Sequence, residues 1–259
     1  MKDFWKSTFS RCALLITVIT LLVGWETFVR IAEVRSFILP APSKIIAGFF
    51  AAPGYLLLQG LNTLITTLAG FALAVVLGIA AAVGIVYYKF LDRTLYSLLV
   101  ALNAVPKVAL APLFVIWLGT GAAPKIAIAM LIAIFPILID MVLGLKSSDP
   151  DMLDMARVNQ ATRAKILWKI QFPNALPSLF AGMKVGVSFA LVGTIVGEFV
   201  AGETGLGHVI LVAQGSFNTP TVFVALTLLC VLGVMLFKLI EAFEARWLTW
   251  HASQLGQKT

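Results

Sequence analysis

The chain has 259 residues, of which 60% are hydrophobic and 12% are charged, and its mean hydropathy is +0.99. Soluble domains are about half apolar and about a quarter charged, so this composition excludes a soluble fold and predicts a protein that lies mostly in lipid. The net charge of +7 does not indicate nucleic-acid binding, because the basic residues lie between apolar runs and do not alternate with stacking aromatic residues.

Apolar runs of about 20 residues recur along the chain, and a helix of that length crosses the roughly 30 Å hydrocarbon core of a bilayer. We therefore predict an all-α, multi-pass membrane protein whose single transmembrane domain covers residues 1–259. Its six predicted spans are residues 12–31, 62–87, 94–118, 124–145, 176–201 and 221–245. The first run follows a basic N-terminus, as in a secretory signal, but it has no clear small-x-small cleavage site and is expected to be retained. A short helix on the outer surface is predicted over residues 45–55.

The basic residues orient these spans. An even number of spans places both termini on one side of the membrane, and cytoplasmic loops carry the excess of Lys and Arg. The residues on that side are Lys2, Lys6, Arg11, Lys89, Arg93, Lys146, Arg157, Arg163, Lys165, Lys169, Arg246 and Lys258. The loop over residues 202–220, on the opposite side, has no Lys or Arg. We expect both termini to be cytoplasmic.

Small residues recur every three or four positions in two of the spans, which makes a smooth helix face that another backbone can approach closely. The glycines of this pattern are Gly70 and Gly78 in one span and Gly182, Gly186, Gly193 and Gly197 in the other. Close packing between helices is the more frequent use of such a face. The alternative is that the face lines a pathway or a seam between two copies of the chain.

The segment over residues 146–175 is a long polar loop among short turns, and such a loop usually has a task. Residues 148–151 (SDPD) begin a helix, because they supply a capping oxygen, a proline for the first turn and acidic side chains at the positive end of the helix dipole. This helix is predicted to reach Asn159. A second short helix is predicted through Ile166 and Ile170 and is expected to end at Phe172-Pro173.

Residues 153–161 (LDMARVNQA) and 172–177 (FPNALP) of this loop resemble the EAA loop of ABC importer permeases. The family pattern is Glu-Ala-Ala, three residues, Gly, and a later Leu-Pro. The chain departs from it most at Gln160, which stands where the turn glycine is expected. A residue other than glycine with positive φ costs about 1 kcal/mol, so we expect Asn159 to take the turn instead.

The resemblance implies that this loop is a cytoplasmic coupling-helix loop that docks on an ATPase. The chain matches the family pattern at Ala156, Pro173 and Pro177 and departs from it at Asp154, Met155 and Gln160. The candidate coupling residues are Asp154, Met155, Ala156, Asn159, Gln160, Ala161, Phe172 and Pro173. Three further segments are similar to the branch of permeases that imports nitrate, sulfonates, taurine, bicarbonate or pyrimidine precursors. They are residues 39–43 (LPAPS), residues 105–113 (VPKVALAPL), and residues 197–199 (GEF) with residues 205–207 (GLG).

The resemblance also implies a type I ABC importer permease fold, with two copies of the chain around one pathway in the bacterial inner membrane. Two ABC ATPase subunits would bind ATP and Mg, and a periplasmic solute-binding protein would deliver the solute. The chain itself is expected to bind no cofactor and to catalyse no reaction, and it has no GxxxxGK[ST] phosphate loop. Its two cysteines lie in apolar runs and its two histidines lie far apart, so no disulfide or metal site is predicted.

Ionisable side chains inside the spans are candidates for the translocation path or its gate. Lys107 lies near the middle of its predicted span between Pro106 and Pro112. It either faces the pathway and attracts an anion or, as we favour, pairs with Asp140 or Glu198 and holds helices in register. Glu198 lies near the outer end of its span, where we expect it to meet water, either as part of an outer gate or as an interfacial charge.

Two other classes of membrane protein are weaker explanations. A stand-alone ion-coupled secondary transporter often shows inverted repeats with matching broken helices, which this sequence lacks. An intramembrane enzyme needs clustered catalytic side chains, which are also absent from the sequence. The solute of an importer is expected to be a small anion, such as a sulfonate or nitrate, or a pyrimidine precursor.

Overall fold

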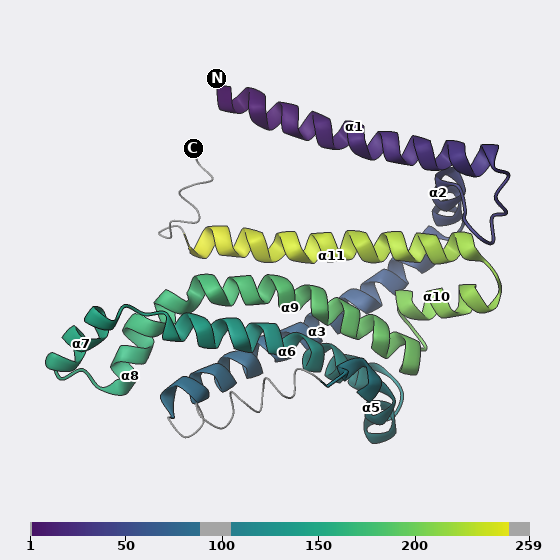
Figure 1. Ribbon diagram of the computed structural model, residues 1–259. Helices are drawn as coiled ribbons and strands as arrows, with labels where there is room; N and C mark the ends of the chain where they lie inside the picture. Colours follow the sequence, from purple (N-terminus) through teal and green to yellow (C-terminus); the bar gives the residue numbers. More distant parts are fainter. Residues whose placement is uncertain (1, 89–104, 249–259) are drawn as a thin grey trace.

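The computed structural model describes residues 2–88 and 105–248, and the side chains within these ranges from residue 16 onward. The described residues form helices and no strand (Figure 1). In chain order the helices are α1 (Lys2–Ile31), α2 (Pro42–Ala51), α3 (Pro53–Tyr87), the 3-10 turn η1 (Lys107–Leu110), α5 (Ala111–Leu118), α6 (Ala122–Lys146), α7 (Pro150–Val158), α8 (Arg163–Ile166), the π-helical turn η2 (Leu167–Gln171), α9 (Phe172–Ala201), α10 (Leu206–Gly215) and α11 (Thr219–Trp247). The prediction of an all-α protein is confirmed.

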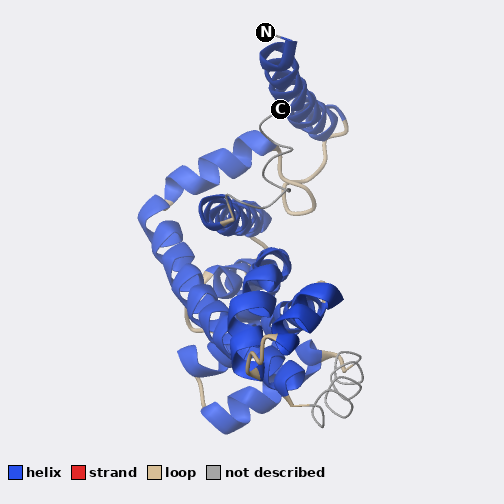
Figure 2. Ribbon diagram, turned by 90° about the vertical axis from the view of Figure 1, so that its left-hand side faces the viewer, coloured by secondary structure: helices blue, strands red, loops and turns tan. Residues whose placement is uncertain are grey.

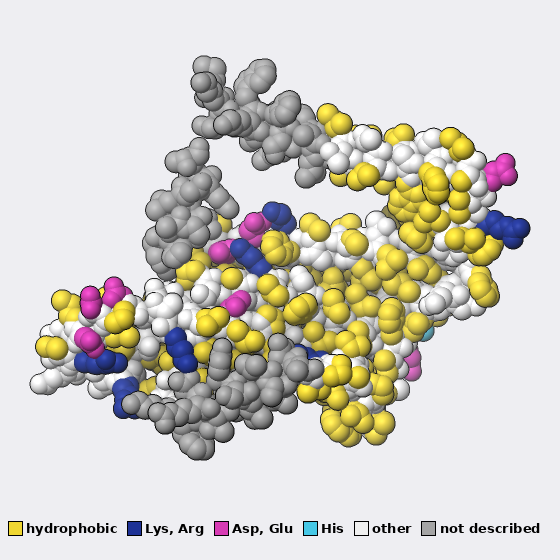
Figure 3. All heavy atoms as spheres, viewed as in Figure 1, with side chains coloured by type: hydrophobic (Ala, Val, Ile, Leu, Met, Phe, Trp, Pro, Cys, Tyr) yellow, Lys and Arg dark blue, Asp and Glu magenta, His cyan; other side chains and the backbone are white. Residues whose placement is uncertain are grey.

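Four of the described helical segments are long and apolar enough to cross a membrane. They are α3, α6, the continuous helix Arg163–Ala201 and α11, and they correspond to the second, fourth, fifth and sixth predicted spans. Large apolar side chains such as Val76 and Val234 are exposed on them, and hydrophobic side chains cover much of the face in Figure 3. The third predicted span, 94–118, lies partly outside the described residues, and the side chains of residues 12–15 in the first predicted span lie outside them too. The total of six spans therefore stays a prediction.

Two predicted helix boundaries are wrong. The helix expected to end at Phe172-Pro173 continues into α9, so the fifth long helix begins at Arg163 and not near residue 176. The π-helical turn η2 explains this: the Phe172 N–H donates to the Leu167 carbonyl, and an α-helical ladder restarts with Pro173 in its first turn, where the missing N–H costs little. The surface helix expected over residues 45–55 ends at Ala51, because Pro53 begins α3.

Helix α6 is the centre of the bundle and packs between α3 and α9 (Figure 1). Figure 2 shows the helices after a turn of 90° about the vertical axis. The glycines of both small-residue faces contact it. A Cβ atom on Gly193 would lie 2.6 Å from the Ala129 Cα atom, and one on Gly70 would lie 2.5 Å from the Ala129 Cβ atom. Similarly, a Cβ atom on Gly186 would lie 2.8 Å from Ile137. The small residues thus let two helices approach α6 at backbone distance from two sides.

Helix α1 stands apart from this bundle and contacts it mainly through α2 at its C-terminal end (Figure 1). The Glu26 carboxylate accepts hydrogen bonds from the Ser43 backbone N–H at 3.0 Å and from the Ser43 hydroxyl at 2.8 Å. Glu26 also forms an ion pair with Arg30 at 2.6 Å. Because Ser43 lies in the first turn of α2, the carboxylate satisfies an N-terminal donor of that helix.

Candidate functional site

The predicted loop forms one end of the bundle, which we call the loop end. Asp149 caps α7, because its carboxylate accepts a hydrogen bond from the Asp151 N–H at 2.9 Å, as the sequence predicts. The turn after α7 differs from the prediction: Gln160 has φ of 56°, whereas Asn159 has φ of −79°. The Ala161 N–H donates to the Ala156 carbonyl at 3.0 Å, and the Gln160 N–H donates to the Arg157 carbonyl at 2.9 Å. This is a Schellman motif, which requires the left-handed conformation at position 160 and not at 159.

Helix α7 presents an apolar stripe to its surroundings. Met152, Met155 and Val158 recur every third residue, and 55%, 70% and 83% of their surfaces are exposed. Acidic residues flank the stripe, and Asp154 forms an ion pair with Arg157 at 2.6 Å. Exposed apolar side chains within a charged segment indicate contact with another protein, because a lipid-facing helix would not carry these carboxylates.

The eight residues of the EAA-like segments lie together at the loop end. Asp154, Met155, Asn159, Gln160 and Pro173 are exposed, and Ala156, Ala161 and Phe172 are half-buried. The Phe172 ring contacts the ring of the exposed Trp168, with 5.0 Å between ring centroids.

Glu198 lies near the opposite end of the bundle, which we call the α10 end. Its side chain is 1% exposed, so the expectation that it meets water is wrong. The Thr63 hydroxyl donates to Glu198 Oε1 at 2.8 Å, and the Gly207 N–H donates to Glu198 Oε2 at 2.7 Å. Because Gly207 lies in the first turn of α10, the buried carboxylate satisfies the N-terminus of that helix and joins it to α3 and α9.

Three successive N–H groups at the start of α10 are held in this way by side chains. Gly205, Leu206 and Gly207 donate to Gln59 Oε1 at 2.6 Å, to Thr63 Oγ1 at 2.8 Å and to Glu198 Oε2 at 2.7 Å, respectively. Glycine is required at two of these positions. Gly205 has φ of 109°, and a Cβ atom on it would lie 2.0 Å from Glu198 Oε1, while one on Gly207 would lie 2.8 Å from Glu198 Cβ. The spacing of the GEF and GLG segments thus follows from the fit of one helix end around one carboxylate.

Lys125 belongs to the same region, and sequence reasoning missed it. The side chain is 4% exposed, and its ammonium group donates to the Thr204 carbonyl at 3.0 Å. Its backbone contacts Gly197, the residue before Glu198. Its position just inside the predicted span 124–145 could have identified Lys125 from the sequence, because an ionisable residue within a span is a candidate for function.

Lys107 lies in η1, so the chain is not a regular α-helix at this point. Its Nζ atom lies 4.2 Å from the centroid of the Phe135 ring of α6, which is a cation–π contact. Pro106 precedes η1, and Pro112 lies in the first turn of α5. Asp140 is half-buried on α6, next to Gly182 of α9. The two roles considered for Lys107 stay predictions.

An ion pair that the sequence did not indicate joins α9 and α11. Lys184 contacts Glu244, and both side chains are largely buried, with 23% and 12% of their surfaces exposed. Among the described residues, no group of three or more His, Cys, Asp or Glu side chains is arranged to hold a metal ion.

Comparisons with known proteins agree with this architecture. Residues 74–249 match the family of binding-protein-dependent transport system inner membrane components. The chain is 37% identical to the riboflavin transport system permease protein RibX of Chloroflexus aurantiacus over 240 residues, covering 92% of this chain and 90% of that protein. It is 30% identical to the formylaminopyrimidine transport permease protein ThiX of Halalkalibacterium halodurans, covering 90% and 94% of the two chains.

The fold is also that of a solved transporter. A chain of the MetNI methionine ABC transporter, in an inward-facing conformation, superposes with a TM-score of 0.67 and 20% identity, over 75% of this chain and 97% of that chain. Together with the sequence matches, this shows that the chain belongs to the family of inner membrane components of binding-protein-dependent transport systems and is a permease subunit of an ABC transporter.

Proposed function

We propose that the chain forms the solute path of an ATP-driven importer of the bacterial inner membrane, with the loop end and both termini in the cytoplasm. Two copies surround the path, a separate pair of ATPase subunits binds ATP and Mg, and a periplasmic protein delivers the solute at the α10 end. The distribution of Lys and Arg supports this orientation.

The apolar stripe of α7 is the main observation that supports the proposed contact with the ATPase. Met152, Met155 and Val158 project from the loop end, where a groove on the ATPase would cover them. The Schellman motif ends α7 at a defined position, so the helix can transmit a push from the ATPase. The segment Arg163–Ala201 is a single helix and connects this loop directly to the buried Glu198 at the α10 end. A displacement at the loop end therefore has a continuous helical path to the α10 end, which passes through the π-helical turn η2.

For the solute, we propose a heterocycle that contains a pyrimidine ring. Two relatives that are at least 30% identical are named for riboflavin and formylaminopyrimidine, and both compounds contain this ring. The relatives named for aliphatic sulfonates and taurine are each 26% identical. Pro106, Lys107, Pro112, Asp140 and Glu198 remain our candidates for the residues that line or gate the path.

Co-purification tests the proposed coupling. The tagged chain is expressed with its ATPase, solubilised and isolated, in parallel with the variants Met155→Asp and Ala164→Asp. Both variants add one carboxylate at an exposed position, but only the first lies on the stripe. We expect Met155→Asp to lose the ATPase and Ala164→Asp to retain it. Equal retention by both variants would contradict docking on the stripe.

A further inference from the structure

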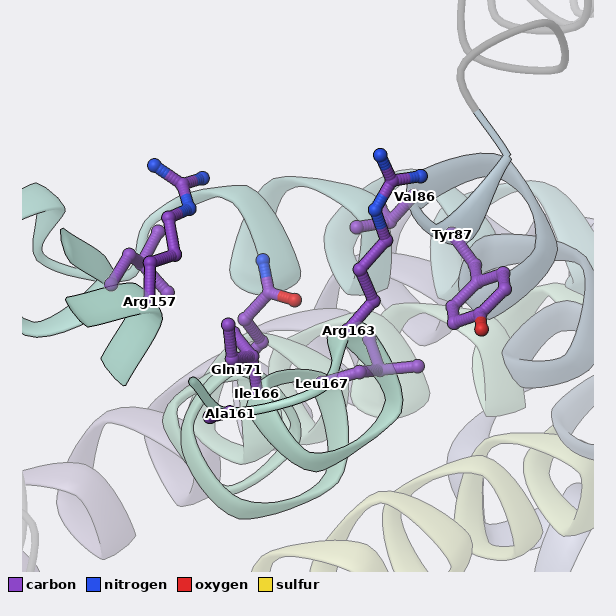
Figure 4. A pocket seen from close by; sticks show the side chains of 9 residues that line it. Val86, Tyr87, Arg157, Ala161, Arg163, Ile166, Leu167 and Gln171 are labelled. Atoms are coloured by element: carbon purple, nitrogen blue, oxygen red, sulfur yellow. The ribbon is translucent and has the colours of Figure 1, made fainter. Parts of the chain in front are cut away.

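A pocket of about 580 Å³ lies at the loop end, between α7, α8 and the last turn of α3 (Figure 4). The apolar residues that line it include Val86 of α3, Leu153 of α7 and Leu167 of η2. Val86 and Tyr87 are the last residues of a helix long enough to cross the membrane. The pocket therefore lies where the bilayer surface meets the loop.

The polar groups of the pocket are cationic or neutral. Arg157 comes from α7 and Arg163 from α8, and their guanidinium groups end on the same side of the pocket as the amide of Gln171 (Figure 4). None of the described residues that line the pocket is acidic. Arg157 uses one nitrogen for its ion pair with Asp154, which leaves other donors of its planar guanidinium for a further acceptor.

The pocket and the apolar stripe occupy opposite faces of α7. At about 100° per residue, the directions of Met152, Met155 and Val158 average about 180° from those of Leu153 and Arg157. Leu153 and Arg157 line the pocket, whereas the stripe points away from it. A protein that covers the stripe therefore leaves the pocket to a different occupant.

We propose that this pocket binds the phosphate headgroup of an anionic phospholipid from the leaflet at the loop end. Two guanidinium groups suit a phosphate, because each can donate two parallel hydrogen bonds to its oxygens. Basic pockets between membrane helices at the bilayer surface bind such headgroups. The apolar lining residues distinguish a lipid from inorganic phosphate, since only a lipid has a glycerol backbone and acyl chains to place against side chains such as Val86 and Leu153.

The test titrates phosphatidylglycerol into the delipidated, detergent-solubilised chain and counts bound lipid by native mass spectrometry. Three double variants are compared with the unaltered chain: Arg157→Gln with Arg163→Gln, Arg157→Lys with Arg163→Lys, and Lys165→Gln with Lys169→Gln. The lysine pair is the matched control, because it removes the same charge from exposed positions of α8 and η2 that do not line the pocket. Thermal unfolding confirms that each variant is folded.

We expect the arginine-to-glutamine pair to weaken phosphatidylglycerol binding by about tenfold or more, the arginine-to-lysine pair to weaken it less, and the control pair to change it less than about twofold. Equal losses in the arginine and control pairs would overturn the proposal, because the attraction would then be diffuse. Displacement of the lipid by equimolar inorganic phosphate or glycerol 3-phosphate would overturn the assignment to a lipid. Unchanged lipid binding with loss of the co-purifying ATPase in the arginine-to-glutamine pair would assign the pocket to the ATPase. The lipid titration contains no ATPase, so it can fail without the proposed function failing.

Discussion

The buried carboxylate of Glu198 offers the sharpest test of the packing at the α10 end. In Glu198→Ala, the Gly207 N–H loses its acceptor at a site closed to water, and the Thr63 hydroxyl keeps only the Gln59 carbonyl, 3.2 Å away. The same substitution leaves space at the junction of α3, α9 and α10. In Glu198→Gln, one side-chain oxygen remains to accept a hydrogen bond.

The magnitude follows from these contacts. Each unsatisfied buried donor costs about 1 to 3 kcal/mol, and the relief of an expensive buried charge offsets part of that loss. We therefore expect Glu198→Ala to lower the free energy of unfolding by about 2 to 4 kcal/mol and Glu198→Gln by about half as much. The backbone amides of Gly205, Leu206 and Gly207 should then exchange hydrogen faster than in the unaltered chain, because the start of α10 is no longer held.

The assay is unfolding in mixed micelles with increasing denaturing detergent, combined with hydrogen exchange of the α10 peptide. Glu203→Ala is the matched control, because Glu203 is an exposed acidic residue only five positions later. The control should change the free energy of unfolding by less than about 0.5 kcal/mol. If Glu198→Ala and Glu203→Ala unfold alike and exchange alike, the reasoning about this carboxylate is refuted.

Three further predictions concern other parts of the chain. Gly193→Ala should lower the free energy of unfolding by about 1 to 3 kcal/mol in the same assay, because the new Cβ atom would lie 2.6 Å from the Ala129 Cα atom. Gly215→Ala is the control and should have little effect, because its new Cβ atom would meet no atom within 4 Å. Gln160→Gly should raise the thermal unfolding temperature, because it removes a left-handed strain of about 1 kcal/mol from the turn after α7; a lower temperature would contradict the assigned Schellman motif. If Lys107 faces the path and attracts an anion, Lys107→Met should raise the Michaelis constant for uptake of an anionic solute. An unchanged Michaelis constant would exclude an anion site at this position.

Hydropathy alone located the four long helices, because the length of an apolar run depends only on neighbouring residues. The capping pattern of residues 148–151 also predicted the start of α7 correctly, because Asp149 and Pro150 act on the residues next to them. Sequence reasoning failed where contacts with residues far away in the chain determine the structure. Nothing near Glu198 in the sequence indicates burial, because its partner Thr63 lies 135 residues away. The sequence predicts a loop over residues 202–220, but the structure has helix α10 there, because ten residues suffice for a helix although they are too few for a span.

The turn after α7 shows a second kind of failure. The intrinsic tolerance of asparagine for positive φ favoured Asn159, but the hydrogen bonds of the Schellman motif fix the left-handed residue by its distance from the helix end. The position of the turn within the helix therefore outweighs the preference of the residue. The π-helical turn before Pro173 is a third case, because a proline that usually ends a helix is tolerated where the ladder of hydrogen bonds restarts.

The central claim is that a separate ATPase drives solute through this chain. The most direct measurement reconstitutes the chain in liposomes, alone or with its ATPase and its binding protein, and follows labelled riboflavin, formylaminopyrimidine and taurine. We predict uptake of a solute only when the ATPase, the binding protein and ATP are all present, and loss of that uptake in Met155→Asp. Uptake by the chain alone under an imposed proton or sodium gradient would contradict the account and would identify an ion-coupled secondary transporter.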